Sequence, residues 1–438
     1  MRDKIVTLVG RPNVGKSTLF NRITNNRSSI TEDTPGVTRD RLYARAEWLG
    51  KPFLLVDTGG LDPQSDDDFM PEIIEQAEVA IESSVAVIFI VDGVSGLTST
   101  DKTILSMLRR MNSNIVLAIN KFDSKESKDN FYDFYELGID NMVQISAEHG
   151  TGVGDLLEEV FKFFPKDEEI EENPDEIKVA LIGKPNVGKS SLLNNILGEK
   201  RAIVTNIPGT TRDSIDTFVE IKDRDFRIID TAGLRKKSKV TEKVERFSAI
   251  RTLSAIDESD ICVLVIDAVE GPSEQDTKVM GYAFENRKGV VIAINKWDLV
   301  EKDSFTQRDY VKEIRNKIQY VPYAPIVFIS AKTGQRVDTL IDTVIKVYDN
   351  YNKRIPTGVL NKIVSDAILM NVTPQDKGRR LKIYYGSQVS AAPPVVIFYV
   401  NDTKLTHFSY TRYLENSIRK NYDFEGVPIS IVYKNRGE

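Results

Sequence analysis

Cysteine and histidine are scarce in this chain of 438 residues, which contains one cysteine and two histidines. A single cysteine excludes an internal disulfide framework and any zinc or iron–sulfur site with several cysteine ligands. Two histidines are too few for a histidine-rich metal centre.

Long apolar segments are also missing. The longest unbroken apolar run is Val85–Val91, whereas a membrane-spanning helix needs about 20 such residues. The N-terminal residues lack the layout of a secretory signal peptide and lead directly into a motif. We therefore expect a soluble, cytoplasmic protein without a membrane partner.

The formal net charge of −6 is unevenly distributed. Acidic residues are in excess over 1–165 and over the stretch 166–176, whereas basic residues are in excess from 177 onward. Such asymmetry is compatible with an ordinary solvated surface. It is also compatible with a C-terminal part that faces a polyanion. Charge alone leaves both interpretations open.

An internal repeat organises the chain. The segment Lys4–Ile23 returns as Ile177–Ile196, 173 residues later, and several shorter motifs follow at nearly the same offset. A repeat of this length corresponds to two whole domains rather than to a solenoid. Each copy alternates short β-branched apolar runs with amphipathic stretches, which predicts an α/β fold with a mainly parallel sheet and helices on both faces.

The rest of the chain divides into a linker and a small third domain. We predict a first domain over 1–165, an acidic linker over 166–176, a second domain over 177–355 and a C-terminal domain over 356–438. The last segment repeats neither half, and its pattern predicts an α+β domain with the order αββαβ.

Each repeat opens with a phosphate-binding loop between a strand and a helix. The spacing is Gly10-x4-Gly15-Lys16-Ser17 in the first copy, and the second copy has the same pattern from Gly183 to Ser190. Glycines let backbone N–H groups surround a β-phosphate, and the lysine pairs with phosphate oxygens. The serine hydroxyl is a ligand for Mg²⁺.

Two further features point to a magnesium-bound triphosphate. Asp57 and Asp230 each follow an apolar strand, 41 residues after the lysine of the phosphate loop, and each begins a D-x-x-G motif. A carboxylate there reaches Mg²⁺ through its water shell. Thr38 and Thr211 are the hydroxyls that both copies of P-G-x-T-R-D share, and they are our candidates for the second Mg²⁺ hydroxyl on a loop ordered by the γ-phosphate.

The bound base follows from the motif N-K-x-D, which occurs at 120–123 and at 295–298. Asp123 and Asp298 can accept hydrogen bonds from N1–H and the 2-amino group of guanine together. Adenine lacks this pair of donors and would leave the carboxylate without a partner. We therefore predict that the chain binds GTP or GDP at two sites.

The group that positions the attacking water is not evident. Many GTPases carry a glutamine directly after D-x-x-G, but Leu61 and Leu234 stand there in this chain. Leucine cannot hydrogen-bond a water molecule. We expect slow unaided hydrolysis of GTP to GDP and phosphate, with the catalytic group supplied from elsewhere; a chain that only binds GTP is the alternative.

The predicted nucleotide residues form two matching sets. The first set is Gly10, Arg11, Pro12, Asn13, Val14, Gly15, Lys16, Ser17, Thr18, Thr38, Asp57, Thr58, Gly59, Gly60, Leu61, Asn120, Lys121, Phe122, Asp123, Ser146 and Ala147. The second set is Gly183, Lys184, Pro185, Asn186, Val187, Gly188, Lys189, Ser190, Ser191, Thr211, Asp230, Thr231, Ala232, Gly233, Leu234, Asn295, Lys296, Trp297, Asp298, Ser330 and Ala331.

With these motifs the whole chain resembles the Der (EngA) family, the bacterial tandem GTPases of the Era-like, TrmE-related group. The resemblance implies two consecutive P-loop GTPase domains followed by a C-terminal α+β domain of the KH-like type. It also implies a role in late assembly of the large (50S) ribosomal subunit, with that subunit, its rRNA and protein assembly factors as partners. Hydrolysis would use Mg²⁺ with help from K⁺, for which Asn13 and Asn186 occupy the family's ligand position.

Contacts to RNA are less well defined by the sequence. RNA-clamping KH domains use a G-x-x-G loop, and residues 356–438 contain none. The C-terminal sheet could contact rRNA or could be a docking face for a GTPase domain. Basic residues near the second D-x-x-G and in the C-terminal domain are the candidates for RNA contact: Arg235, Lys236, Lys237, Lys377, Arg379, Arg380, Arg412, Arg419 and Lys420.

Two other classes of function remain open. A GTPase of tRNA modification or membrane traffic is disfavoured, because the chain lacks a modification domain, an amphipathic membrane segment and a reactive-cysteine motif. A GTP-sensing scaffold without catalysis is the other. We expect a monomer and no DNA partner.

Overall fold

The computed structural model describes residues 5–24, 43–58, 78, 80–82, 84–112, 114–164, 173, 175–198, 203–204, 216–231, 243–301, 303, 305–376 and 378–436. The chain forms two compact units. The first comprises residues 1–172 and 238–254, and the second comprises residues 173–237 and 255–438. The boundary at 172 lies inside the stretch that the sequence analysis treats as a linker.

The first unit is built on one six-stranded sheet with the order β2-β3-β1-β4-β5-β6. Strand β2 pairs antiparallel with β3, and the other neighbours pair in parallel. The strands are β1 (Ile5–Val9), β2 (Tyr43–Trp48), β3 (Lys51–Asp57), β4 (Ala86–Asp92), β5 (Ile115–Asn120) and β6 (Met142–Gln144). The helices are α1 (Lys16–Thr24), α3 (Ser99–Met111), α4 (Lys125–Asp129), the 3₁₀ helix η1 (Phe131–Leu137) and α5 (Val153–Phe161).

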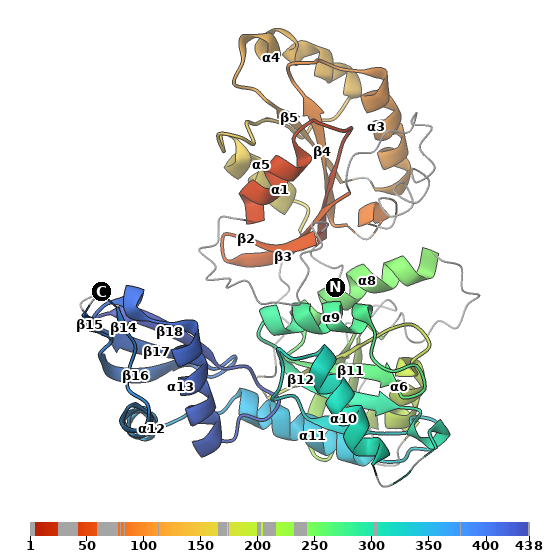
Figure 1. Ribbon diagram of the computed structural model, residues 1–438. Helices are drawn as coiled ribbons and strands as arrows, with labels where there is room; N and C mark the ends of the chain where they lie inside the picture. The colour runs from red at the N-terminus through yellow and green to blue at the C-terminus, as the bar shows by residue number, and fades with distance from the viewer. Residues whose placement is uncertain are drawn as a thin grey trace. The chain divides into compact units, whose positions relative to one another are not determined.

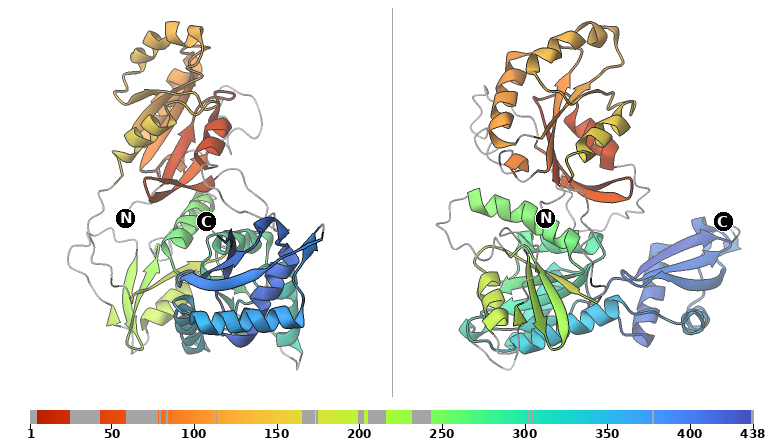
Figure 2. Two further views of the ribbon diagram at one scale, coloured as in Figure 1. Left: turned by 90° about the vertical axis from the view of Figure 1, so that its left-hand side faces the viewer. Right: turned by 180° about the vertical axis from the view of Figure 1, so that it is seen from behind.

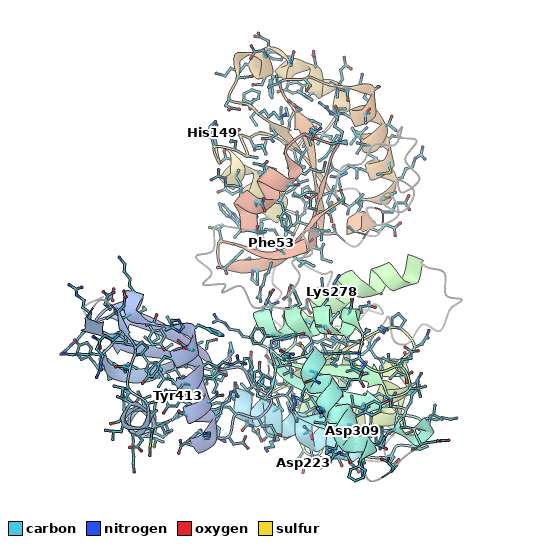
Figure 3. The ribbon with its side chains drawn as sticks, viewed as in Figure 1. Phe53, His149, Asp223, Lys278, Asp309 and Tyr413 are labelled. Atoms are coloured by element: carbon cyan, nitrogen blue, oxygen red, sulfur yellow. The ribbon has the colours of Figure 1, made fainter. Side chains whose placement is uncertain are left out.

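Helices cover both faces of this sheet, as Figure 1 shows for α1 and α5 on one side and α3 on the other. The central strands are buried on both faces, which explains their continuous apolar sequences. Successive residues of one strand enter different cores: Ile88 packs with the α1–α5 side, whereas Phe89 packs with the α3 side. Phe53, labelled in Figure 3, meets Phe161 edge to face at 5.5 Å between ring centroids and so joins β3 to α5.

The second unit contains a seven-stranded sheet with the order β13-β12-β11-β7-β10-β9-β8. Its parallel strands repeat the arrangement of the first unit. The strands are β7 (Ile177–Ile182), β8 (Ile203–Val204), β9 (Thr217–Ile221), β10 (Arg224–Ile229), β11 (Ile261–Asp267), β12 (Gly289–Asn295) and β13 (Ile326–Phe328). The helices are α6 (Lys189–Gly198), α9 (Glu274–Glu285), η2 (Trp297–Leu299), α10 (Thr306–Lys317) and α11 (Val337–Tyr351). Helix α8 (Lys243–Glu258) crosses the boundary between the two units, which falls after residue 254.

The C-terminal part has the αββαβ order that the sequence predicts, with a short added hairpin. Its three-stranded sheet has the order β16-β17-β18, in which β18 lies parallel to β17. The elements are α12 (Thr357–Met370), the hairpin β14 (Gln375–Asp376) and β15 (Arg379–Arg380), β16 (Ile383–Ser390), β17 (Val395–Val400), η3 (Thr403–Leu405), α13 (Phe408–Asn421) and β18 (Ser430–Asn435).

This C-terminal part shares one hydrophobic core with the second GTPase-like sheet. Helix α11 leads from one into the other, as the views in Figure 2 show. Gly426 fixes the junction: its N–H donates to the Tyr323 carbonyl at 2.9 Å, and its own carbonyl accepts from the Val290 N–H at 2.7 Å. Arg419 lies 4.3 Å over the Tyr323 ring. The two parts are therefore packed as one unit.

Replacing Gly426 by alanine tests this junction. Gly426 has a φ of +78°, and a Cβ would come within 2.3 Å of Val347 Cγ2. We expect Gly426→Ala to lower the free energy of unfolding of the second unit by about 2 kcal/mol or more. Urea titration followed by Trp297 fluorescence, in a Trp48→Phe background, measures it.

The matched control is Gly378→Ala. Gly378 has almost the same φ, +79°, but a Cβ there would meet no atom within 4 Å. The control carries the backbone strain alone, about 1 kcal/mol. Equal losses in the two variants would contradict a packing role for Gly426.

Candidate functional site

In both units the described candidates gather at the carboxyl edge of the sheet. They come from the loop after the first strand of each repeat, from the end of the strand that carries the D-x-x-G aspartate, and from the turns after β5 and β6 or β12 and β13. The carboxyl ends of parallel strands meet at one edge, which is where open α/β sheets bind ligands. Residues that lie more than 100 positions apart are thereby brought together.

The phosphate loops have the backbone that their glycines permit. Gly15 and Gly188 have φ values of 99° and 101°, and Asn13 and Asn186 are also left-handed at 65° and 61°. Lys16 is almost fully buried, and its Nζ donates to the carbonyls of Gly10 at 2.9 Å and Arg11 at 2.7 Å. Lys189 makes the same pair of bonds in the second copy. Each lysine is held where phosphate oxygens would meet it.

Burial changes the acid–base behaviour of both lysines. It lowers the pKa of Lys16 to about 8, against the attraction of nearby Asp57. It likewise lowers the pKa of Lys189 to about 8, against the attraction of Asp276. Phosphate oxygens beside either ammonium group would favour its charged form.

The two repeats differ at the aspartate of D-x-x-G. In the first unit, Ser17 Oγ donates to Asp57 Oδ2 at 3.2 Å, so the two predicted metal ligands face each other. In the second unit Asp230 has a left-handed φ of 50°, and its N–H donates to Asp216 Oδ1 at 3.0 Å. Equal sequence motifs thus have unequal local conformations.

One buried asparagine in each repeat joins the phosphate loop to the base-binding turn. Asn120 Nδ2 donates to the Val14 carbonyl at 2.8 Å, and its Oδ1 accepts from the Ala147 N–H at 2.9 Å. Asn295 repeats both bonds with Val187 at 2.7 Å and Ala331 at 2.8 Å. These residues, which the motifs predict to form one site, are thus connected by the side chain of one asparagine in each repeat.

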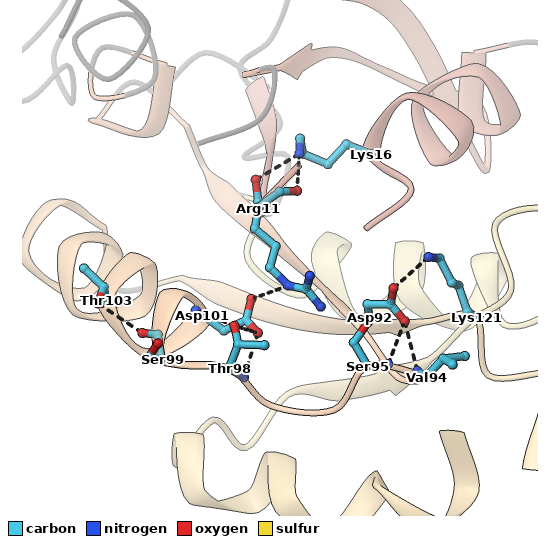
Figure 4. A network of polar contacts seen from close by, with 11 residues as sticks. Arg11, Lys16, Asp92, Val94, Ser95, Thr98, Ser99, Asp101, Thr103 and Lys121 are labelled. Carbon is cyan, nitrogen blue, oxygen red and sulfur yellow. Dashed lines mark hydrogen bonds and ion pairs between the residues drawn. The ribbon is translucent and has the colours of Figure 1, made fainter. Parts of the chain in front are cut away.

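The lysine of N-K-x-D is held by an aspartate that the sequence analysis missed. Lys121 Nζ lies 2.6 Å from Asp92 at the end of β4 (Figure 4), and Lys296 Nζ lies 2.5 Å from Asp267 at the end of β11. Burial would raise the pKa of Asp92, but the hydrogen bond from Lys121 and those from backbone amides hold it below the ordinary value. Both apolar runs end in an aspartate, and this shared position in the two repeats is the sequence signal that could have identified the pair.

Arg11 of the phosphate loop reaches a helix cap, which is also shown in Figure 4. Its Nε lies 3.4 Å from Asp101 Oδ1, and Asp101 forms a capping box with Thr98 at the start of α3. Ser273 and Asp276 form the equivalent box at the start of α9. The phosphate loop of the first unit is therefore braced by a neighbouring helix.

The aspartate that the sequence predicts to select guanine in the first repeat, Asp123, lies beside a histidine. His149, labelled in Figure 3, places Nε2 3.2 Å from Asp123 Oδ2. Both side chains are exposed. Thr333 occupies the corresponding position after Ser330-Ala331. No sequence motif marks this contact, because it depends on how the two turns approach each other.

The basic candidates of the C-terminal domain divide into two groups. Arg379, Arg380, Arg412 and Lys420 are exposed. Arg419 instead donates to the carbonyls of Phe424 at 2.9 Å and Val427 at 2.8 Å, and pairs with Glu415 at 2.8 Å. Arg419 thus serves the packing of its own domain.

Some predicted residues lie outside the described part of the chain. They are Thr38, Gly59, Gly60, Leu61, Thr211, Ala232, Gly233, Leu234, Arg235, Lys236, Lys237 and Lys377.

Comparison with known proteins decides the family. A family model for "50S ribosome-binding GTPase" matches residues 5–121 and 178–296, and a model for the "KH-domain-like of EngA bacterial GTPase enzymes, C-terminal" matches residues 354–434. The chain is 54% identical to GTPase Der of Thermoanaerobacter sp. (strain X514), over all of both chains. It is 51% identical to GTPase Der of Clostridium perfringens (strain 13 / Type A), again over both full lengths.

The chain belongs to the Der (EngA) family. The resemblance predicted from the motifs is confirmed, as is the fold class of two P-loop GTPase domains with a C-terminal KH-like domain. The Der family assignment makes the chain a guanine-nucleotide-binding GTPase.

More distant structures share less of the chain. A crystal structure of a variant of Aquifex aeolicus Era bound to GDP·AlF₄⁻ is 24% identical, covers 60% of this chain and 93% of its own, and has a TM-score of 0.31. Among the described residues, no helix is long and apolar enough to cross a membrane.

The lowered pKa values of Lys16 and Lys189 predict that nucleotide affinity depends on pH. The free sites lose a proton near pH 8, whereas bound phosphate keeps the lysine charged. Binding therefore takes up a proton as the pH rises past 8, and affinity falls. We expect the Kd for GDP to rise about fourfold between about pH 7 and about pH 8.5.

Isothermal titration calorimetry in two buffers of different ionisation enthalpy measures both the Kd and the proton uptake. A Kd that stays constant across this range, with no proton taken up at the upper end, would show that the lysines remain charged in the free protein.

Proposed function

We propose that this chain is a GTP-hydrolysing assembly factor that acts in late maturation of the 50S ribosomal subunit. The observation that carries the proposal is one chain with two matches to a GTPase family model and a KH-like domain that shares a hydrophobic core with the second of them. The name of the matching family model, a ribosome-binding GTPase, supports the same partner. The nucleotide state of the two sites would control attachment to the ribosome and its rRNA.

The proposed domains are 1–165, 177–355 and 356–438, and residues 166–176 form the linker between the first two. The second and third domains act as one body, because Gly426 hydrogen-bonds and Arg419 packs across the junction between them. A change of nucleotide in the second GTPase domain would thus be transmitted directly to the KH-like domain. We expect this to take place in the cytoplasm.

Magnesium fits the oxygen ligands at the first site. Ser17 Oγ and Asp57 Oδ2 lie 3.2 Å apart at the phosphate loop, and hydroxyl and carboxylate oxygens suit a hard cation. Ser17 and Asp57, with Thr38, would hold Mg²⁺, and Ser190, Thr211 and Asp230 would do so in the second domain. Bound Mg²⁺ supplies charge neutralisation at the β- and γ-phosphates.

This chain's own residues would then perform the binding steps. Lys16 and Lys189 neutralise phosphate charge, and the N–H groups of the loops orient the phosphates. Asp123 and Asp298 select guanine, while Asn120 and Asn295 keep the phosphate and base ends in register. Because Leu61 and Leu234 cannot orient water, intrinsic hydrolysis would be slow.

Potassium would provide the missing help. Asn13 and Asn186 are exposed in the left-handed turns of the phosphate loops, where their amide oxygens can serve as ligands for K⁺. We expect the rate of GTP hydrolysis to be about tenfold higher in KCl than in NaCl of equal ionic strength. Asn13→Ala and Asn186→Ala should each remove part of that difference. Equal rates in the two salts, measured by phosphate release, would refute K⁺ assistance.

The ribosomal role is tested by co-sedimentation with purified 30S and 50S subunits. We expect binding to 50S with a non-hydrolysable GTP analogue, and loss of binding with GDP. Lys16→Ala or Lys189→Ala alone should weaken analogue-dependent binding by about tenfold or more, because each removes the buried cation from one site. Lys312→Ala, an exposed lysine on α10, is the matched control.

Binding that ignores the nucleotide would contradict the proposed switch. Binding to neither subunit would contradict the ribosomal role, and GTP hydrolysis would then serve another partner. Single replacements by glutamate would test the KH-like domain as an RNA-contacting surface, at Lys377, Arg379, Arg380, Arg412 and Lys420. The same replacement would test the basic segment after the second D-x-x-G motif, at Arg235, Lys236 and Lys237.

A further inference from the structure

The base-binding turn of the first GTPase domain is held by a side chain from α1. Arg22 Nε donates to the Ala147 carbonyl at 3.2 Å, and Arg22 Nη2 donates to the Glu148 carbonyl. The planar guanidinium thus meets two successive carbonyls of the turn that follows β6. A side chain 125 positions earlier in the chain fixes the backbone beside the guanine site.

The second domain lacks this support. Asn195 occupies the position of Arg22 in the repeat, and Gly334 occupies that of Gly150. The two side chains lie in the same place: a Cβ on Gly150 would be 3.7 Å from Arg22, and a Cβ on Gly334 would be 3.3 Å from Asn195. Within the described residues, Asn195 makes no hydrogen bond to the turn that follows β13.

Arg22 also connects the two ends of the nucleotide site. Helix α1 begins at Lys16 in the phosphate loop, and Arg22 lies in its last turn. The Ala147 N–H on the base side is held by Asn120, which also holds the Val14 carbonyl on the phosphate side. The first domain therefore has two links between its phosphate and base ends, whereas the second has the asparagine link without the arginine.

We propose that Arg22 is a positioning residue that makes the first GTPase domain retain guanine nucleotide longer than it would with the asparagine of the second domain. By holding the Ala147–Glu148 backbone, it keeps the base-binding turn in its closed position before and during occupancy. The inference rests on guanine-nucleotide binding by the first domain, and it does not depend on the ribosomal role proposed above.

The experiment follows release of a fluorescent GDP from the full chain. Lys189→Ala in the background removes the lysine of the second phosphate loop, so the signal reports the first site. We expect Arg22→Asn to raise the dissociation rate constant about tenfold, since two charge-assisted hydrogen bonds are lost. Arg22→Lys keeps the charge but only one donor position, and should give an intermediate rate.

Arg109→Asn is the matched control. Arg109 on α3 also donates to two successive carbonyls, those of Leu137 at 2.6 Å and Gly138 at 2.8 Å, but away from the nucleotide turns. Its loss should leave the release rate unchanged. The unfolding midpoint of the nucleotide-free protein, measured for both variants, separates positioning from general stability.

Two results would overturn the proposal. One is a release rate in Arg22→Asn within twofold of the parent. The other is an equal acceleration in Arg109→Asn, which would mean that loosening the unit anywhere has the same effect. A faster release confined to the Arg22 variants, with an unfolding midpoint matching that of Arg109→Asn, would support it.

Discussion

Each nucleotide site depends on one buried amide at the end of a central strand. Asn120 and Asn295 hydrogen-bond the phosphate loop on one side and the base-binding turn on the other. The amide lies so close to the loop that a Cβ on Gly15 or on Gly188 would come within 2.2 Å of it. The glycine of the loop and the asparagine of N-K-x-D are therefore parts of one interaction. Because one side chain at a strand end makes both hydrogen bonds, it fixes the separation between the phosphate loop and the turn after the next strand.

Different residues surround this asparagine interaction in the two GTPase domains. The first adds Arg22 from α1 and His149 beside Asp123. The second has Asn195 and Thr333 at those positions and turns Asp230 into a left-handed conformation. Duplicated sites with unequal support can hold nucleotide for unequal times, since lifetime depends on how firmly the closed turn is held. A chain with two such sites can respond to GTP in more than one step.

Packing also makes the second domain different from the first. Its sheet, α11 and the C-terminal domain share a continuous core. Arg419 shows how this is achieved, because it faces the Tyr323 ring and the carbonyls of the segment that carries Gly426. A basic residue that sequence alone would assign to a nucleic-acid surface is in fact part of an internal junction. Of the basic residues predicted to contact RNA in this domain, Arg379, Arg380, Arg412 and Lys420 are exposed.

The sequence by itself determined the duplicated α/β domains, the nucleotide motifs and the family. Buried parallel strands require continuous apolar runs, and phosphate and guanine recognition require particular residues at fixed local spacing, so both leave a readable pattern. The sequence also predicted the αββαβ order of the C-terminal domain. Tertiary structure alone decided that Asp92 holds Lys121, that Arg22 reaches Ala147, and that Arg419 faces inward. The contacts of Asp92 and Arg22 join residues 29 and 125 positions apart, while that of Arg419 depends on which face of α13 is packed. Such partners are set by the register of strands and the facing of helices, which no local motif encodes.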